Sequence, residues 1–484
     1  MDFFALKQLP HDVALTFGDV ALPEGHSDIR SRSEISDFRT QLSPNLKLSI
    51  PFISANMESV TGPEMIIAVE REGGLGIIPQ SIPVEEKKRI LDVVKRADCA
   101  RINDPLTINF GKTLREAKNL MNRFKIYSLV VVDEKFMPLG ILSTRDWKYE
   151  TDENKKVEEL MSANLIKANH DIGFEEARSI LRKNKIEKLP LVDKTGKLTS
   201  LITAHGLFYH MHYPRALRDE NGQFIRVGSI GVGKTFKPEH MQDVELQINS
   251  GITALLIDTA RAFSENTRDA IVAVKKAFPK LTLIVGNVST PEGAKFLFES
   301  GADVVKVGQG PGEACRTREV GIGIPQLTAI AACSAVAKKF GKTVIADGGI
   351  KNPGDIVKAI IAGASAVMIG YLFAGTEESP PEPYSYYSED LKADLAVKDY
   401  IGSASHHAQV NRIGKGNLDY LRRPEGIKRI VPVTGSLSRR VSDLLDGMRS
   451  AMSYLGARNL KELHEKGYFV PQTKAGHTEG VKRA

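Results

Sequence analysis

Between about residues 228 and 375, short apolar runs alternate with stretches of helical periodicity. The runs are rich in β-branched residues and cover 253–259, 281–288, 302–308, 343–349 and 364–370. Residues 265–278 and 325–340, which lie between such runs, carry apolar positions at helical spacing. Strands that are apolar throughout and alternate with helices predict a parallel sheet covered on both faces.

Most of these predicted strands end in glycine or in a polar residue. The positions are Asp258, Asn287, Gly308, Asp347 and Gly370. This pattern favours an α/β fold of the (β/α)8 TIM-barrel type, in which the chemistry gathers at the carboxyl ends of the strands. A doubly wound sheet is the alternative, but no phosphate-binding G-x-G-x-x-G motif follows the first strand.

An internal repeat interrupts this organisation. Residues 114–147 recur sixty positions later as residues 174–207, with Glu116-Ala117 matching Glu176-Ala177. Each copy reads as helix, strand, turn and strand, and two copies predict a small paired domain and not a solenoid. We place this domain at residues 95–211, inserted between a first barrel part at 1–94 and a second at 212–484.

The repeat resembles a tandem pair of CBS modules. The run from Ser143 to Asp146, S-T-R-D, matches the adenosine-ribose signature of such modules. The second copy has Ala204-His205-Gly206 instead, so we expect at most one good nucleotide site, for ATP or GTP, with Thr144 and Asp146 as its residues. A repeat that serves only for packing is the alternative.

Composition limits the possible classes of protein. The 484 residues are 42% hydrophobic and 26% charged, which is typical of a globular protein. The net charge of +7 is spread over scattered lysines and arginines without an aromatic-interleaved basic stripe, so we expect anionic metabolites as partners and no nucleic acid. No apolar run approaches ~18 residues and no signal peptide is evident, which predicts a cytoplasmic protein without a membrane span.

A P-loop pattern at residues 228–235, GSIGVGKT, suggests an NTPase at first sight. The P-loop mechanism needs a strand that ends just before the first glycine and a helix that opens at the Lys-Thr pair. Here the strand itself is expected to include the glycines, and Pro238 closely follows the pair. We therefore disfavour the NTPase interpretation.

The chain has three cysteines, Cys99, Cys315 and Cys333, too few for a disulfide framework and consistent with a reducing compartment. Cys315 lies in the glycine-rich segment 306–326, which follows a predicted strand. Backbone N–H groups and neighbouring arginines favour a thiolate, and the Thr317 hydroxyl can exchange a proton with it. These surroundings favour a nucleophile over a buried loop thiol.

This segment resembles the catalytic loop of the IMP dehydrogenase/GMP reductase family, whose pattern is roughly G-x-G-P/S-G-S-x-C-x-T. Further family motifs occur in order at 15–22, 54–61, 73–80, 257–264, 286–294, 346–370, 424–427 and 447–466. The resemblance covers nearly the whole chain. It implies a barrel with an inserted CBS pair and a homotetramer or homo-octamer.

The resemblance also implies roles for individual residues. Cys315 would attack C2 of a purine nucleotide to give a covalent adduct, with Thr317 as its proton-transfer partner. The substrate-binding set would be Asp347, Gly349, Gly370, Tyr400, Glu425 and Glu313. Asp258 and Arg261 would bind the nicotinamide cofactor, and the backbone carbonyls of Gly310, Gly312 and Cys315 would hold a K⁺ ion.

The segment 400–427 corresponds to the mobile flap of the family and bears on the reaction. A dehydrogenase hydrolyses its adduct with an Arg-Tyr pair on this flap, whereas here Arg412 is followed by Ile413. Residues 404–417 and 455–466 resemble the CBS-containing branch of GMP reductases. We therefore expect GMP and NADPH to give IMP, ammonia and NADP⁺, with IMP dehydrogenase acting with NAD⁺ as the alternative. Shorter reductases place a glutamate where His406 stands, so His406 or the adjacent His407 is a candidate for proton transfer; the alternative is that both are surface residues of the flap.

Glu313 departs from the family pattern, because the family places a phosphate-binding serine there. A carboxylate at 4 Å repels a phosphate charge by ~1 kcal/mol in water and by more in a sheltered site. We expect Glu313 to turn outward to Arg316 or Arg318, leaving the substrate phosphorylated. Two alternatives are an unphosphorylated guanine derivative as substrate and a non-catalytic nucleotide sensor, although the Cys-x-Thr sequence and Asp347 argue against a sensor.

Overall fold

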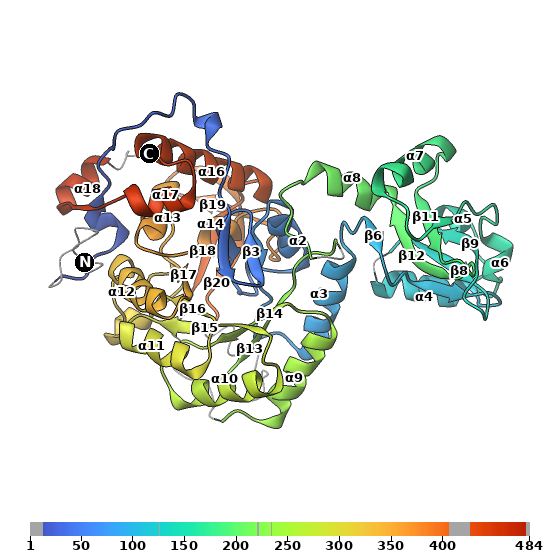
Figure 1. Ribbon diagram of the computed structural model, residues 1–484, viewed down its shortest axis with the longest axis horizontal. Coiled ribbons are helices and arrows are strands. Elements are labelled where there is room, and N and C mark those ends of the chain that lie inside the picture. Colours follow the sequence, from blue (N-terminus) through green and yellow to red (C-terminus); the bar gives the residue numbers. More distant parts are fainter. Residues whose placement is uncertain (1–12, 125, 220–221, 234, 406–425, 481–484) are drawn as a thin grey trace. The chain divides into compact units, whose positions relative to one another are not determined.

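Eight parallel strands form a barrel in the computed structural model, which describes residues 13–124, 126–219, 222–233, 235–405 and 426–480 (Figure 1). Their order is β13-β14-β15-β16-β17-β18-β4-β5, and a parallel bridge between Ile77 and Val227 joins the two end strands. The strands are β4 (Phe52–Ser54), β5 (Leu75–Gly76), β13 (Val227–Gly231), β14 (Ala254–Asp258), β15 (Thr282–Val288), β16 (Val304–Val307), β17 (Thr343–Asp347) and β18 (Ala366–Ile369). The expected (β/α)8 barrel is confirmed.

A helix follows each strand and packs on the outside of the barrel, as Figure 1 shows for α9 to α13. These helices are α2 (Pro63–Arg71), α3 (Val84–Arg96), α9 (Pro238–Asn249), α10 (Glu265–Ala277), α11 (Pro291–Ser300), α12 (Gln326–Lys339), α13 (Pro353–Ile361) and α16 (Leu437–Tyr454). Leu255, Leu256 and Ile257 of β14 are fully buried, as a strand covered on both faces requires. The apolar runs therefore predicted the barrel strands β14 to β18 for the correct physical reason.

Shorter elements complete the barrel unit. A three-stranded antiparallel sheet has the order β19-β20-β21, and two small pairs join β1 to β22 and β2 to β3. These elements are β1 (Val20–Ala21), β2 (Thr40–Ser43), β3 (Leu46–Leu48), α14 (Tyr371–Ala374), β19 (Tyr384–Ser388), β20 (Ala393–Ile401), β21 (Lys428–Pro432), α17 (Leu460–Lys466), β22 (Val470–Pro471) and α18 (Lys474–Gly480), with 3₁₀ turns at Phe17–Asp19, Arg32–Glu34 and Thr317–Val320. No helix in the described ranges is long and apolar enough to cross a bilayer.

The chain divides into two compact units, residues 1–91 with 225–484 and residues 92–224. The inserted unit thus begins three residues earlier than the sequence suggests and extends beyond residue 211. The Arg218 guanidinium explains the extension, because its Nη1 donates to the carbonyls of Asp98 and Gly222, each at 3.0 Å. Residues after α8 therefore fold back onto the start of the same unit.

The inserted unit has the predicted repeat. Its elements are β6 (Arg101–Ile102), β7 (Thr107–Asn109), α4 (Leu114–Phe124), β8 (Ser128–Val132), β9 (Pro138–Ser143), α5 (Thr144–Trp147), α6 (Val157–Leu160), β10 (Ala168–Asn169), α7 (Phe174–Asn184), β11 (Lys188–Val192), β12 (Leu198–Thr203) and α8 (Ala204–His212). The two copies pack through Val130 and Val132 of β8 and Leu198 and Leu201 of β12. Each copy thus buries an apolar face that it cannot bury alone.

The P-loop pattern lacks its structural context. Strand β13 runs from Val227 through Gly231, so it contains the first glycines of the pattern, and helix α9 begins only at Pro238. A phosphate cradle requires the glycines between strand and helix, with the helix opening at the Lys-Thr pair. The structure therefore gives no support to an NTPase site here.

Candidate active site

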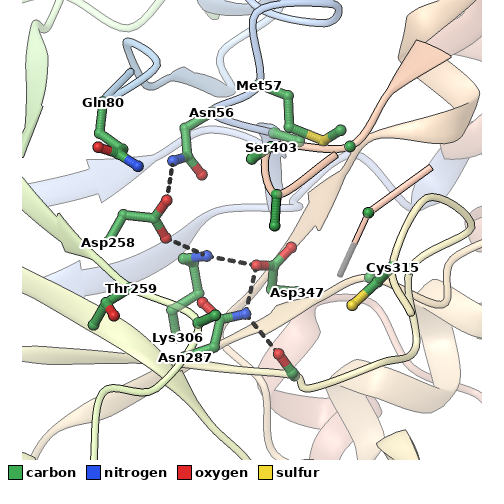
Figure 2. Close-up of a pocket in the computed structure, with 18 of the residues that line it drawn as sticks. Asn56, Met57, Gln80, Asp258, Thr259, Asn287, Lys306, Cys315, Asp347 and Ser403 are labelled. Atoms are coloured by element: carbon green, nitrogen blue, oxygen red, sulfur yellow. Dashed lines mark hydrogen bonds and ion pairs between the residues drawn. The ribbon is translucent and has the colours of Figure 1, made fainter. Parts of the chain in front are cut away.

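A cavity of about 620 Å³ lies at the carboxyl ends of the barrel strands (Figure 2). Its lining includes the last residues of three strands, Gly231, Asp258 and Asp347, together with Gly370 directly after β18. The volume falls within the range of pockets that bind cofactors and small substrates. Parallel strands that end at one rim thus bring together residues more than 130 positions apart in the sequence.

Lys306 of β16 lies at the centre of the polar network in this cavity. Its Nζ is 2.6 Å from Asp347 Oδ2 and 3.2 Å from Asp258 Oδ1, and its side chain is only 3% exposed. Burial by itself would lower the pKa of the ammonium, but the two carboxylates outweigh burial and raise it. Lys306 is therefore a permanent cation between two carboxylates.

Two asparagines complete the network, as Figure 2 shows. Asn56 Nδ2 donates to Asp258 Oδ2 at 2.9 Å, and Asn287 Nδ2 donates to Asp347 Oδ2 at 2.9 Å. Asn287 Nδ2 also donates to the Gly308 carbonyl at 2.6 Å. The network thus fixes both carboxylates and the start of the cysteine loop.

Cys315 lines the same cavity on the loop that follows β16. Its Sγ lies 3.2 Å from Thr317 Oγ1, so a proton can pass between thiol and hydroxyl. Cys315 is exposed, whereas Cys99 and Cys333 are buried, and burial raises the pKa of the Cys333 thiol. Only Cys315 of the three therefore combines access to a substrate with a nearby proton acceptor.

The two neighbouring arginines hold the loop instead of facing the thiol. Arg316 Nε pairs with Glu319 Oε1 at 3.2 Å. Arg318 Nη2 donates to the Ile324 carbonyl at 2.8 Å, and its Nε donates to the Gln309 carbonyl at 3.4 Å. The expected partnership of these arginines with Glu313 is accordingly wrong.

Glu313 instead pairs with cations from two other elements. Lys351 Nζ is 2.8 Å from Glu313 Oε1, and Arg429 Nη1 is 3.1 Å from Oε2. Glu313 is not among the residues that line the cavity. The carboxylate is thus turned away as expected, with its charge offset by one residue after β17 and one residue of β21.

Tyr400 and Gly370 lie together at one end of the cavity. A Cβ atom on Gly370 would come within 2.6 Å of the Tyr400 hydroxyl, so only glycine fits there. Burial and the nearby carboxylates of Asp347 and Glu313 raise the pKa of Tyr400, which keeps it a neutral donor. Gly348 lines the cavity beside them, whereas Gly349 does not.

The described ends of the flap segment hold the cysteine loop. Gly402 N donates to the Ile427 carbonyl at 2.9 Å, and Ile427 N donates to the Ala314 carbonyl at 3.1 Å. An antiparallel bridge also joins Cys315 to Gly426. His406 and Glu425, as well as the Arg412-Ile413 pair, lie outside the described residues.

The remaining predicted residues lie at several places. Asp258 lines the cavity, but Arg261 is exposed and does not. Gly310 and Gly312 also line it, and the Gly312 carbonyl accepts the Cys315 N–H at 3.0 Å. The sequence interpretation missed Lys306, Asn287 and Asn56 as site residues, although Asn287 was noted as the polar end of a predicted strand.

The predicted nucleotide signature of the inserted unit lies at the start of α5. Asp146 Oδ2 accepts hydrogen bonds from Ser143 N at 2.6 Å and from Ser143 Oγ at 2.7 Å. In the second copy, the Thr203 hydroxyl accepts the Gly206 N–H at 2.9 Å, and Gly206 stands in the place of the aspartate. The two copies therefore differ at the position expected to bind ribose.

Comparisons with known proteins show which family this chain is similar to. A family model described as the IMP dehydrogenase / GMP reductase domain matches residues 14–482. The inosine-5'-monophosphate dehydrogenase of Aquifex aeolicus (strain VF5) is 42% identical over 470 residues, which is 96% of this chain and 94% of that protein. The same-named protein of Staphylococcus aureus (strain Mu50 / ATCC 700699) is 40% identical over 476 residues, 96% of this chain and 95% of its own.

Two solved structures that share the fold of this chain are named as GMP reductases and not as dehydrogenases. A variant GMP reductase from Trypanosoma brucei in complex with guanosine 5'-monophosphate superposes with a TM-score of 0.87 at 33% identity, covering 98% of each chain. The GMP reductase from the same organism in complex with guanosine 5'-triphosphate gives a TM-score of 0.77 at 31% identity, covering 95% of this chain and 98% of that one.

Proposed function

Because the chain belongs to the IMP dehydrogenase/GMP reductase family, and is thus an oxidoreductase of that family, we propose that it reduces GMP to IMP. The observation that carries this proposal is the Cys315 thiol, which lies 3.2 Å from the Thr317 hydroxyl in a cavity that also holds Asp347. A nucleophile with a proton-transfer partner at a barrel rim is the arrangement that covalent catalysis requires.

Each of these residues has a specific task in the reaction. The Cys315 sulfur attacks C2 of the purine, and Thr317 exchanges a proton with the thiol or the base. Asp347 accepts hydrogen bonds from the ribose hydroxyls. Tyr400 and the backbone N–H groups around Gly349 and Gly370 bind the 5'-phosphate, since peptide N–H groups form a sufficient anion site. Glu425 hydrogen-bonds the base, and His406 assists the departure of ammonia.

Two observations favour the reductase over the dehydrogenase. Arg412 is followed by Ile413, so the Arg-Tyr pair that activates water for hydrolysis is missing from the sequence. The likeness to a GMP reductase bound to guanosine 5'-monophosphate extends over 98% of the chain. In the balanced reaction, GMP, NADPH and a proton give IMP, ammonia and NADP⁺.

IMP dehydrogenase is the second candidate. It is favoured by the 42% and 40% identity to two proteins with that name over almost their whole length. The same Cys315 adduct at C2 would then be hydrolysed to XMP, and NAD⁺ would be the oxidant. The two candidates share the site and differ in the fate of the adduct.

The cofactor supplies or accepts the hydride in either reaction. Asp258 fits a cofactor subsite because it lines the cavity and its Oδ1 lies 3.2 Å from Lys306 Nζ. Arg261 would approach the cofactor only at the edge of the cavity. A K⁺ ion at the carbonyls of Gly310, Gly312 and Cys315 is a further part of the proposal, with the Gly312 carbonyl shared with the Cys315 N–H.

A pair of absorbance assays tests the proposal. The purified protein is incubated with GMP and NADPH, and separately with IMP and NAD⁺, and the nicotinamide absorbance is followed. We expect oxidation of NADPH in the first assay. Turnover only in the second assay would show an IMP dehydrogenase. A third assay replaces GMP by guanosine, and turnover of guanosine but not of GMP would show an unphosphorylated substrate. No turnover in any of the three assays would favour a nucleotide sensor.

A further inference from the structure

Lys306 is buried and contacts the carboxylates of both Asp258 and Asp347 (Figure 2). Among the described residues, no other lysine or arginine contacts both. Asp258 ends β14 and Asp347 ends β17, so the two carboxylates come from opposite sides of β16. Two carboxylates and one ammonium leave the cluster with a net charge of −1. Neither carboxylate has a lysine or arginine of its own among the ion pairs that the structure describes.

We propose that Lys306 is a positioning residue that holds Asp258 and Asp347 as one shared unit, so that a single ammonium orients both the substrate subsite and the cofactor subsite. This inference rests on the proposed function, which assigns Asp347 to the substrate ribose and Asp258 to the cofactor. The neutral donors Asn287 and Asn56 each serve only one carboxylate. Lys306 alone therefore links the two subsites.

The positive charge of Lys306 matters because the carboxylates of Asp258 and Asp347 both pair with its Nζ atom. If the lysine were neutral, like-charge repulsion in a buried site would raise the pKa of at least one carboxyl group. A protonated Asp347 loses acceptor capacity for ribose hydroxyls. The other titratable groups that line the cavity are Cys315, Tyr400, His240 and Asp243, and all of them remain in wild type as well as in a Lys306 variant.

The first experiment needs no ligand and compares thermal unfolding of wild type and Lys306→Met across pH. In the variant, the raised carboxyl pKa means that ionisation destabilises the fold at high pH, and protonation relieves this as pH falls. The Tm deficit of Lys306→Met should therefore be largest near pH ~7.5 and shrink as the pH falls toward ~4.5, close to the ordinary aspartate pKa of about 3.9. A deficit that is constant from pH ~7.5 to ~4.5 would overturn the shared-charge proposal.

The second experiment measures binding of GMP and of NADPH separately by calorimetry. Lys306→Met should weaken both ligands at least about tenfold, since hydrogen bonds to charged groups contribute more than ~1.4 kcal/mol. Asn287→Ala should weaken GMP only. Lys275→Met is the matched stability control, because Lys275 pairs with Asp303 at 2.6 Å outside the cavity and should leave both affinities unchanged.

A double variant keeps the test decisive if Lys306→Met folds poorly. Adding Asp258→Asn restores the cluster charge to −1 and leaves Asp347 without a like-charged neighbour at this position. GMP affinity and Tm should therefore recover relative to Lys306→Met; failure of both to recover would overturn the proposal. A wild type that binds neither GMP nor IMP would refute the proposed function, while the ligand-free melting curves would still decide the role of Lys306.

Discussion

At the scale of single residues, the chemistry depends on what surrounds each thiol. Cys315 is exposed next to the Thr317 hydroxyl, whereas Cys99 donates to the Arg101 carbonyl and Cys333 to the Thr290 carbonyl in buried positions. A thiolate is the reactive form, and burial in apolar surroundings disfavours it. Three chemically identical side chains are thus expected to differ greatly in reactivity.

The first prediction concerns Cys315. Cys315→Ala should abolish turnover and leave the unfolding midpoint nearly unchanged, because the side chain is exposed and packs little. Iodoacetamide should alkylate Cys315 of wild type faster than the other two cysteines, as peptide mass spectrometry can measure. Cys333→Ala is the control and should retain turnover. Equal labelling of the three thiols, or an active Cys315→Ala enzyme, would refute the assignment.

The second prediction concerns Thr317. Thr317→Val keeps the shape of the side chain but removes the hydroxyl that lies 3.2 Å from the thiol. We expect kcat to fall on the order of 10²-fold with little change in KM, since general acid–base groups contribute about that much or more. Thr317→Ser should restore most of the rate because it returns the hydroxyl. A serine variant as slow as the valine variant would contradict the proton-transfer role.

At the scale of elements, the strand pattern predicted much of the barrel but only part of the site. The apolar runs gave β14 to β18, whereas β4 and β5 have three and two residues and present no comparable run. Their pairing depends on tertiary contacts that a local pattern does not contain. The polar ends of β14 and β17 were likewise predicted from the sequence.

Lys306 shows why the rest of the site could not be predicted. It lies within the apolar run 302–308, where a lysine would ordinarily turn its charge to solvent, and its two carboxylates are 48 and 41 positions away in the sequence. Only the register that aligns Gly286 with Lys306 and Lys306 with Ile345 brings these partners to its sides. Lys351 and Arg429, the partners of Glu313, were missed because they too lie far from it in the sequence.

The third prediction concerns the loop that carries Glu313. Lys351 and Arg429 leave this group of three charges with a net +1, so the wild type should prefer its nucleotide substrate over the matching nucleoside in kcat/KM. Glu313→Ser should raise that preference severalfold, since one repulsive charge pair is worth ~1 kcal/mol in water. Glu319→Ser, on the same loop, is the control. A wild type that prefers the nucleoside, with the preference reversed by Glu313→Ser, would exclude a phosphorylated substrate.

The fourth prediction concerns the strand that carries Tyr400. Lys398 of β20 is buried, and its Nζ donates to the carbonyls of Thr376, Glu377 and Ser379 at 2.8, 3.1 and 2.9 Å. Burial lowers the pKa of this lysine. Lys398→Met should reduce the free energy of unfolding by about 1–3 kcal/mol, because it removes the Lys398 donor from the buried Ser379 carbonyl. The exposed Lys392→Met should change it by less than about 0.5 kcal/mol in denaturant titrations; equal effects would contradict the anchoring role.

At the scale of the whole molecule, a barrel unit with the candidate site is combined with a two-copy unit that carries a different set of polar residues. The barrel gathers its functional side chains at one rim, while the inserted unit has Asp146 in one copy and Gly206 at the matching position of the other. Of the two matching positions expected to contact a ribose, only position 146 therefore carries a carboxylate. This difference is the basis for proposing a single regulatory nucleotide site in the first copy.

The fifth prediction follows from this asymmetry. We propose that the protein forms a homotetramer or homo-octamer and that ATP or GTP, bound at Thr144 and Asp146, changes its assembly or activity. Sedimentation velocity with and without each nucleotide should show an oligomer in every case and a shift in the sedimentation coefficient on nucleotide addition.

The variant Asp146→Asn tests the proposed nucleotide site. It removes the charge but keeps an acceptor for the two Ser143 hydrogen bonds, so it should abolish the shift without unfolding α5. Asp171→Asn, an exposed aspartate of the same unit, should respond like wild type. A monomer at all nucleotide concentrations would refute the oligomer, and an unchanged response in Asp146→Asn would move the nucleotide site elsewhere, because no other carboxylate is in hydrogen-bond contact with Ser143 in the described part of the chain.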